Sequence, residues 1–179
     1  MGASFPDDAL ERLEPLRLSL LAVGRLKSGP ERELVERYRQ RVEGMGRALG
    51  LAGLDIVELP ESRARRDDDR RAEEAAALLE KAGSSALIIF DERGRSPSSE
   101  AFAEKIRQWR DEGRPGVACV IGGPDGLDPK LRQRAELVVS FGALTMPHQI
   151  VRALVAEQLY RALTIIAGHP YHRAGHDDS

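Results

Sequence analysis

Short apolar runs alternate along this chain with longer segments in which apolar residues recur every three or four positions. The short runs predict strands at residues 16–23, 86–90, 117–121 and 137–141, and the alternating segment 54–59, which ends at Pro60, predicts a fifth. The runs at 86–90 and 117–121 are almost continuously apolar, which is typical of parallel strands covered on both faces. The segments between the runs have helical spacing.

These helical segments are marked by apolar spacing and by residues that favour helix ends. They are predicted at residues 30–44, across 75–79 up to Gly83, from Ser98 or Ser99 to Gly113, after Asp128, and at 147–167. Strands that alternate with helices predict an α/β domain with a mainly parallel sheet flanked by helices. Residues 1–15 have no clear period and are interpreted as an N-terminal extension.

Composition agrees with one ordinary globular domain. The chain has 179 residues, of which 41% are hydrophobic and 31% charged. A domain of this length buries roughly 70% of the surface of its unfolded chain, so it can form a core without disulfides or structural metal. The single cysteine, Cys119, lies in an apolar run and is predicted to be a buried thiol rather than a nucleophile.

Charge and hydropathy exclude several classes of protein. The formal net charge of −2 does not indicate a globally basic nucleic-acid binder. The apolar runs are far shorter than a membrane span, and the N-terminus lacks the pattern of a signal peptide. We therefore expect a cytoplasmic protein that does not use a membrane.

Three loops that follow predicted strands carry the candidate chemistry. They are Asp91 to Gly94, Gly122 to Gly126, and Phe141 to Pro147. The carboxyl ends of parallel strands meet at one edge of a sheet, where α/β proteins bind ligands. Glycines there let a ligand approach the backbone. Neither the P-loop nor the GxGxxG pattern is present, which favours a smaller adenosine-containing ligand over ATP or NAD.

Three motifs together resemble a known family. IGGPDGL at 121–127, ALTMPHQIVRALVAEQLYRA at 143–162 and HPYHR at 169–173 are similar, in this order, to the SPOUT-class methyltransferases that modify N3 of a pseudouridine in 23S rRNA. The resemblance covers residues 16–173 and leaves 174–179 as a C-terminal extension. It implies a SPOUT fold with a C-terminal deep trefoil knot, S-adenosylmethionine as cofactor, and a homodimer.

The resemblance also implies which residues form the cofactor pocket. They are Phe90, Gly123, Gly142, Ala143, Leu144, Thr145, Met146 and Pro147. A side chain at Gly123 is expected to occupy ligand space. The sulfonium of the cofactor already makes its methyl group electrophilic, so no metal is expected, and the sequence has no Cys/His cluster with ligand spacing.

The C-terminal tail is implied to fold over the cofactor site, and we expect this to be the partner subunit's site. Attack by N3 needs proton removal or stabilisation of the charge on the base. Arg173 suits charge stabilisation, His172 suits proton removal, and Tyr171 could stack on or hydrogen-bond the base. His148, at the start of the last helix, is another catalytic candidate. The alternatives are a solvated terminus and a helix-start histidine bonded to its own backbone.

The last predicted helix indicates a partner subunit. The last predicted helix has more apolar positions than one contact needs, so we expect a homodimer built partly on Leu154, Leu159 and Leu163. The arginines at 63–71 flank a block of three aspartates and are interpreted as a solvated helix start rather than phosphate contacts. Near-neutral charge favours a large preassembled substrate, 23S rRNA in the large subunit or ribosome. The alternatives are another RNA, such as tRNA, and a non-catalytic ligand-binding module.

Overall fold

A five-stranded parallel sheet forms the centre of the computed structural model, which describes residues 14–175. Its order is β2-β1-β4-β3-β5, and every neighbouring pair is parallel. The strands are β1 (Leu16–Val23), β2 (Leu51–Leu59), β3 (Ala86–Arg95), β4 (Gly116–Ile121) and β5 (Leu137–Val139). The α/β prediction is therefore confirmed. The two predicted extensions fall almost entirely outside the described residues.

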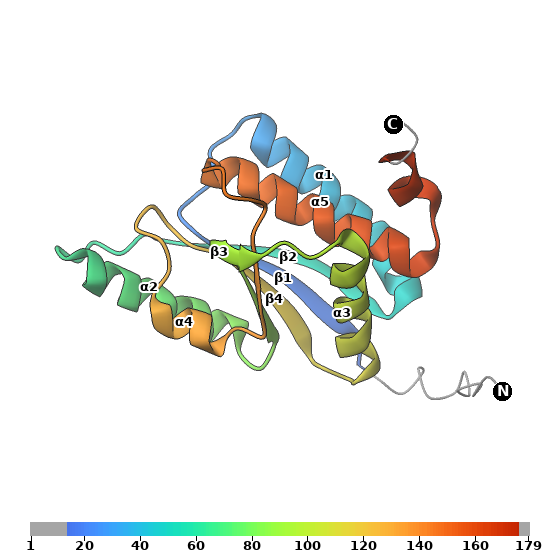
Figure 1. The fold of residues 1–179 in the computed structure, drawn as a ribbon, viewed down its shortest axis with the longest axis horizontal. Coiled ribbons are helices and arrows are strands. Elements are labelled where there is room, and N and C mark those ends of the chain that lie inside the picture. Colours follow the sequence, from blue (N-terminus) through green and yellow to red (C-terminus); the bar gives the residue numbers. More distant parts are fainter. Residues whose placement is uncertain (1–13, 176–179) are drawn as a thin grey trace.

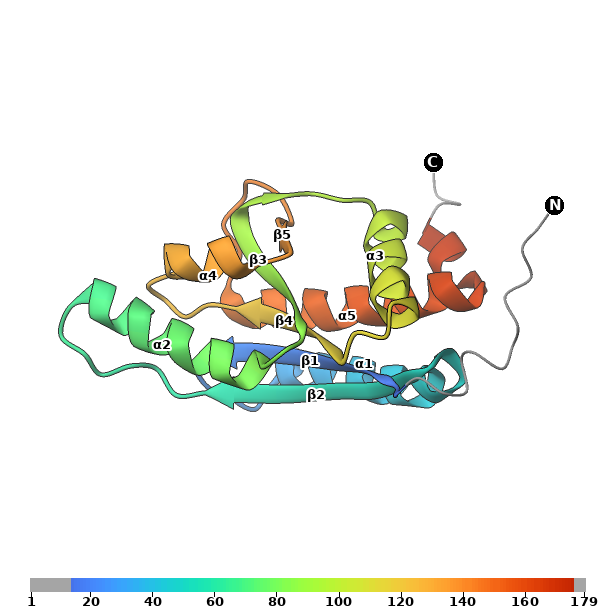
Figure 2. The same cartoon turned by 90° about the horizontal axis from the view of Figure 1, so that it is seen from below.

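Helices cover both faces of the sheet (Figures 1 and 2). They are α1 (Pro30–Gly46), α2 (Asp67–Ala82), α3 (Ser99–Asp111), α4 (Pro129–Arg134) and α5 (His148–Ala167), with short 3-10 helices η2 (Arg47–Leu49) and η3 (Pro170–Gly175). One buried cluster joins the sheet to α1, α3 and α5, and a second joins the opposite face to α2 and α4. The molecule thus has three layers.

Helix ends follow local chemistry. The side chain of Ser98, not Ser99, caps α3 by accepting from the amide of Ala101 at 3.1 Å, and Asp128 caps α4 by accepting from Lys130 N at 2.7 Å. The helix α2 begins at Asp67, earlier than its apolar residues suggest. Three aspartates in its first turn stabilise this start, because their negative charges interact favourably with the positive end of the helix dipole.

The strand β3 is longer than its apolar run because it leaves and rejoins the ladder. Phe90 and Arg95 both pair with Val139, so residues 91–94 bulge between them. A Cβ atom at Gly94 would lie 2.7 Å from the carbonyl of Val138, so this position needs glycine. The bulge places three charged residues, 91–93, at the carboxyl edge of the sheet.

The prediction that Leu159 and Leu163 form a subunit interface is wrong. Both are fully buried within the chain, where α5 packs between α1 and α3 and against the sheet. The many apolar positions of α5 are therefore used by contacts within one subunit, and Leu154 is half-buried. The prediction for Cys119 is confirmed: it is buried in β4, and this burial raises the pKa of its thiol to about 12.

Candidate active site

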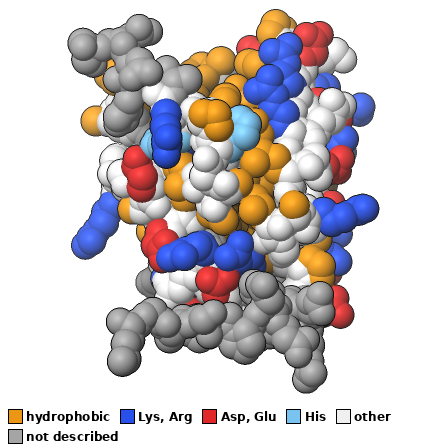
Figure 3. Space-filling view, turned by 90° about the vertical axis from the view of Figure 1, so that its right-hand side faces the viewer, with side chains coloured by type: hydrophobic (Ala, Val, Ile, Leu, Met, Phe, Trp, Pro, Cys, Tyr) orange, Lys and Arg blue, Asp and Glu red, His pale blue; other side chains and the backbone are white. Residues whose placement is uncertain are grey.

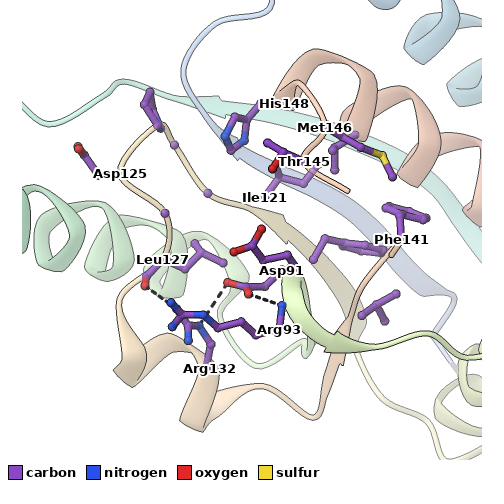
Figure 4. Close-up of a pocket in the computed structure, with 18 of the residues that line it drawn as sticks. Asp91, Arg93, Ile121, Asp125, Leu127, Arg132, Phe141, Thr145, Met146 and His148 are labelled. Carbon is purple, nitrogen blue, oxygen red and sulfur yellow. Dashed lines mark hydrogen bonds and ion pairs between the residues drawn. The ribbon is translucent and has the colours of Figure 1, made fainter. Parts of the chain in front are cut away.

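The three candidate loops border one cavity of about 630 Å³ at the carboxyl edge of the sheet (Figure 4). Most of the predicted cofactor contacts line it: Phe90, Gly123, Gly142, Leu144, Thr145 and Met146. His148 lines it too, from the first turn of α5. Ala143 and Pro147 are exposed and lie outside the lining. The three loops therefore share one cavity, and the assignment of particular residues to the cofactor stays a prediction.

An aromatic pair forms one wall of the cavity. The rings of Phe90 and Phe141 stack with centroids 5.4 Å apart and planes 16° apart, and Phe102 meets Phe90 edge-on at 6.4 Å. Phe141 was not among the predicted contacts, although it begins the loop that contains them. Flat apolar surfaces of this kind suit the face of a heterocyclic base.

A charged pair faces this wall across the cavity (Figure 4). The Asp91 side chain is only 12% exposed, and its Oδ2 lies 3.3 Å from Nε of Arg132. Asp91 Oδ1 accepts from the amide of Arg93 at 2.9 Å, while Arg132 donates to the carbonyl of Leu127 at 3.4 Å. These contacts join the bulge of β3 to α4 and to the glycine loop after β4. Sequence reasoning missed Arg132, whose only signal was its place in the short helix after the glycine loop.

Two arginines from the charged run hold the glycine loop. Arg70 contacts both carboxylate oxygens of Asp125, with Nε to Oδ2 at 2.7 Å and Nη2 to Oδ1 at 3.2 Å, and this hydrogen bonding lowers the pKa of Asp125. Arg71 lines the cavity and approaches the Asp125 carbonyl oxygen at 3.4 Å. The interpretation of the run as a solvated helix start is therefore wrong for Arg70 and Arg71. Arg63, Arg65 and Arg66 are exposed.

Gly123 faces the protein interior. A Cβ atom there would lie 3.0 Å from Val23 and 3.3 Å from the buried carboxylate of Glu74. The expectation that its side chain would occupy ligand space is therefore wrong: a substitution would press on the core and displace the loop. Gly142 differs, because its φ is +123° and a Cβ atom would meet nothing within 4 Å, so its backbone is open on one side.

A family model described as "Predicted SPOUT methyltransferase" matches residues 16–172. The chain belongs to this family. The relatives that it matches include the "Ribosomal RNA large subunit methyltransferase H" of Bradyrhizobium sp., 59% identical over 89% of this chain and 100% of the relative, and that of Methylobacterium radiotolerans, 60% identical over 88% and 98%. The SpoU methyltransferase AviRb from Streptomyces viridochromogenes, solved with AdoMet, is a distant structural neighbour: TM-score 0.41, 14% identity, 94% of this chain and 67% of the neighbour.

In this SPOUT methyltransferase, Arg152 anchors the start of α5 beside the cavity. Its buried side chain donates to Glu58 Oε2 at 2.9 Å and to the carbonyls of Val23 and Gly24 at 3.0 and 2.9 Å. Burial lowers the pKa of Arg152. Burial would raise the pKa of Glu58, but hydrogen bonds from Leu26 and Arg32 outweigh it and the pKa is lowered. His148 lies one turn before Arg152 and is fixed with it.

The tail lies at the other end of α5. Tyr171, His172 and Arg173 belong to η3, which follows the last turn of that helix (Figure 1). The 20 residues of α5 span about 30 Å. Of the four predicted catalytic residues, the structure therefore brings only His148 to the cavity of its own chain.

Two further observations concern residues 14–175. Within this range, no three His, Cys, Asp or Glu side chains are grouped so that they could hold a metal ion. None of the helices in the same range is long and apolar enough to cross a membrane.

Proposed function

We propose that this chain is an S-adenosylmethionine-dependent methyltransferase acting in the cytoplasm on N3 of a pseudouridine in 23S rRNA. Its substrate would be the large ribosomal subunit or the assembled ribosome. The observation that carries the proposal is the 59–60% identity, over nearly their whole length, to relatives named ribosomal RNA large subunit methyltransferase H.

The cavity fits the proposed cofactor. Its volume of about 630 Å³ is in the range of small-molecule sites, roughly 300–1,000 Å³. The Phe90–Phe141 wall suits the adenine, the open space beside Gly142 lets a ligand approach the backbone of the last loop closely, and the acidic groups of Asp91 and Glu92 suit its cationic part. When bound, S-adenosylmethionine supplies an electrophilic methyl group. The loops of this chain hold it in one orientation and exclude water.

We further propose a homodimer in which the tail of one subunit completes the cavity of its partner. The support is the length of α5, which separates Arg173 from the cavity of its own chain. In the shared site, Arg173 stabilises negative charge on the base, His172 or His148 receives the N3 proton, and Tyr171 contacts the base. The deep trefoil knot stays a prediction from the family resemblance.

Mass spectrometry of rRNA from cells with and without the gene tests the substrate. We expect one methylated pseudouridine in 23S rRNA to disappear with the gene and to return when purified protein and S-adenosylmethionine are added to the mutant's ribosomes. An unchanged rRNA pattern together with a change in tRNA would move the activity to another RNA. The absence of any change would favour the non-catalytic module.

Arg173→Ala tests the tail. Loss of one contact that stabilises developing charge costs about 3 kcal/mol, or on the order of a hundredfold in rate. Cofactor affinity, measured by calorimetry, should stay unchanged because Arg173 is proposed to act on the base and not on the cofactor. Arg107→Ala is the matched control, since its partner Glu104 lies on the exposed face of α3. A full methylation rate in Arg173→Ala would instead favour the interpretation of the tail as a solvated terminus.

A further inference from the structure

Two carboxylates hold the tail against its own chain, and the cavity uses neither of them. The first is Glu157, in the middle of α5, with a side chain only 15% exposed. Its Oε1 accepts from the hydroxyl of Tyr171 at 3.2 Å and from Arg161, with Nε at 3.0 Å and Nη2 at 2.5 Å. The Tyr171 ring also meets Tyr160 edge-on at 4.8 Å. Burial raises the pKa of Tyr171, so its hydroxyl stays protonated and donates.

The second carboxylate is Glu100, in the first turn of α3. Its Oε1 lies 2.6 Å from Nε2 of His172, and Nδ1 of the same ring lies 3.4 Å from Nη1 of Arg161. A guanidinium only donates, so in the neutral ring Nδ1 accepts from Arg161 and Nε2–H donates to Glu100. The two contacts fix the rotation of the imidazole, and Nδ1, held by the longer contact, is the nitrogen that receives the N3 proton when Arg161 releases it.

Both carboxylates come from the junction between α3 and α5, which is itself built to be rigid. The side chain of Ser98 caps α3, and the hydroxyl of Ser99 donates to Gln158 Oε1 at 3.0 Å. Glu100 and Glu157 are therefore fixed with respect to each other. Figure 3 looks onto this end of the molecule, where cationic side chains border a run of hydrophobic ones.

We propose that Glu100 and Glu157 are positioning residues that hold the tail in the conformation it offers to the partner's cavity. This rests on the proposed shared site. Tyr171 and His172 are then already held in place before the subunits and the RNA meet. Less conformational entropy is therefore lost when the active site becomes ordered. Neither carboxylate touches the substrate: each acts through the tail residue that it binds.

Single substitutions give the first test. We expect Glu100→Gln and Glu157→Gln to lower kcat about tenfold, since a hydrogen bond to a charged group contributes about that factor or more. Glu104→Gln, one turn further along α3 and exposed, is the matched control and should keep full activity. Cofactor affinity should be unchanged in all three, and Tm should be unchanged in Glu100→Gln and Glu104→Gln, whose carboxylates are exposed. Glu157→Gln also weakens the mostly buried pair with Arg161, so its rate is compared at a temperature well below its own Tm. A drop in Tm or in cofactor affinity that accounts for the lost rate would overturn the positioning role.

Mixed dimers give the decisive test. One subunit carries Gly142→Val, which calorimetry must show to abolish cofactor binding, and the other carries Arg173→Ala. Only one composite site then keeps both a sound cavity and a sound tail. We expect Glu100→Gln to lower the rate when it is placed in the Gly142→Val subunit, which supplies the working tail, and to have no effect in the Arg173→Ala subunit.

The outcomes separate the two proposals. Equal loss from either placement, or loss only in the Arg173→Ala subunit, would overturn the positioning role while the shared site stands. An inactive parent mixture, without any Glu100 substitution, would overturn the shared site itself and the positioning role with it. Mixed dimers are isolated with two different affinity tags so that homodimers do not contribute.

Discussion

Replacing Arg152 by methionine tests how firmly the start of α5 is fixed beside the cavity. Methionine retains an unbranched, flexible side chain and removes the guanidinium. The Arg152 side chain is only 7% exposed and donates to Glu58 and to the carbonyls of Val23 and Gly24. In the variant, these acceptors lose that donor. The change therefore breaks a buried ion pair and leaves two carbonyls at the end of β1 without this partner.

The structure sets the size of the effect. Removing one partner of a buried ion pair costs about 3–5 kcal/mol. Glu58 keeps Arg32 at 2.9 Å and the amide of Leu26, and its side chain is 24% exposed, so the cost should lie near the lower end. About 3 kcal/mol corresponds to a fall in Tm of roughly 6–12 °C for a domain of this size.

Urea unfolding and thermal scans followed by circular dichroism measure this cost. The matched control is Arg107→Met, which breaks a pair of similar length, 2.8 Å, between side chains that are 50% and 61% exposed. Exposed pairs contribute about 0–1 kcal/mol, so the control should change the free energy of unfolding little. Equal free energies of unfolding for the two variants would refute the view that Arg152 anchors α5.

Three further outcomes follow from the fold. The pKa of Glu58 is lowered in the folded protein, so its carboxylate stabilises the fold fully above the pKa it has in the unfolded chain, and this stabilisation is lost as the pH falls through the folded pKa. The free energy of unfolding should therefore depend less on acidic pH in Glu58→Gln. The thiol of Cys119 should resist iodoacetamide until the protein unfolds, and native labelling at the unfolded rate would contradict its burial. Gly94→Ala should lower Tm and cofactor affinity together, because the added methyl group meets the Val138 carbonyl; an unchanged Tm would show that the bulge can shift.

The sequence predicted most of the sheet because every strand contains a short segment that is mainly apolar or alternates between apolar and polar residues. The span of β1 was predicted without error, and α3 and α5 followed from their spacing and caps. The second half of β3 could not be predicted, because four of the residues 91–95 are charged and their strand geometry comes from pairing with β5. The role of α5 was also misjudged, since a sequence does not say how many neighbours a helix has.

The candidate site, like the fold, could be predicted from the sequence only in part. Local signals located its loops, because glycines after apolar runs mark the carboxyl edge of a parallel sheet. Contacts between distant segments gave no such signal. The pair of Arg70 and Asp125 joins residues 55 positions apart, and the pair of Glu100 and His172 joins residues 72 apart. Both pairs can be recognised only in the folded chain.

The position of β1 between β2 and β4 determines when the protein can fold during synthesis. Ser19 of β1 pairs with Ala118 of β4, so about a hundred residues of chain must close into a loop before the central ladder forms. Loop closure of this length slows folding relative to local pairing. In a nascent chain that ends before β4, β1 has β2 on one side, and its other edge is open because β4 has not yet been made. For roughly the first two thirds of translation, the apolar edge of β1 that β4 later covers is exposed and prone to aggregation.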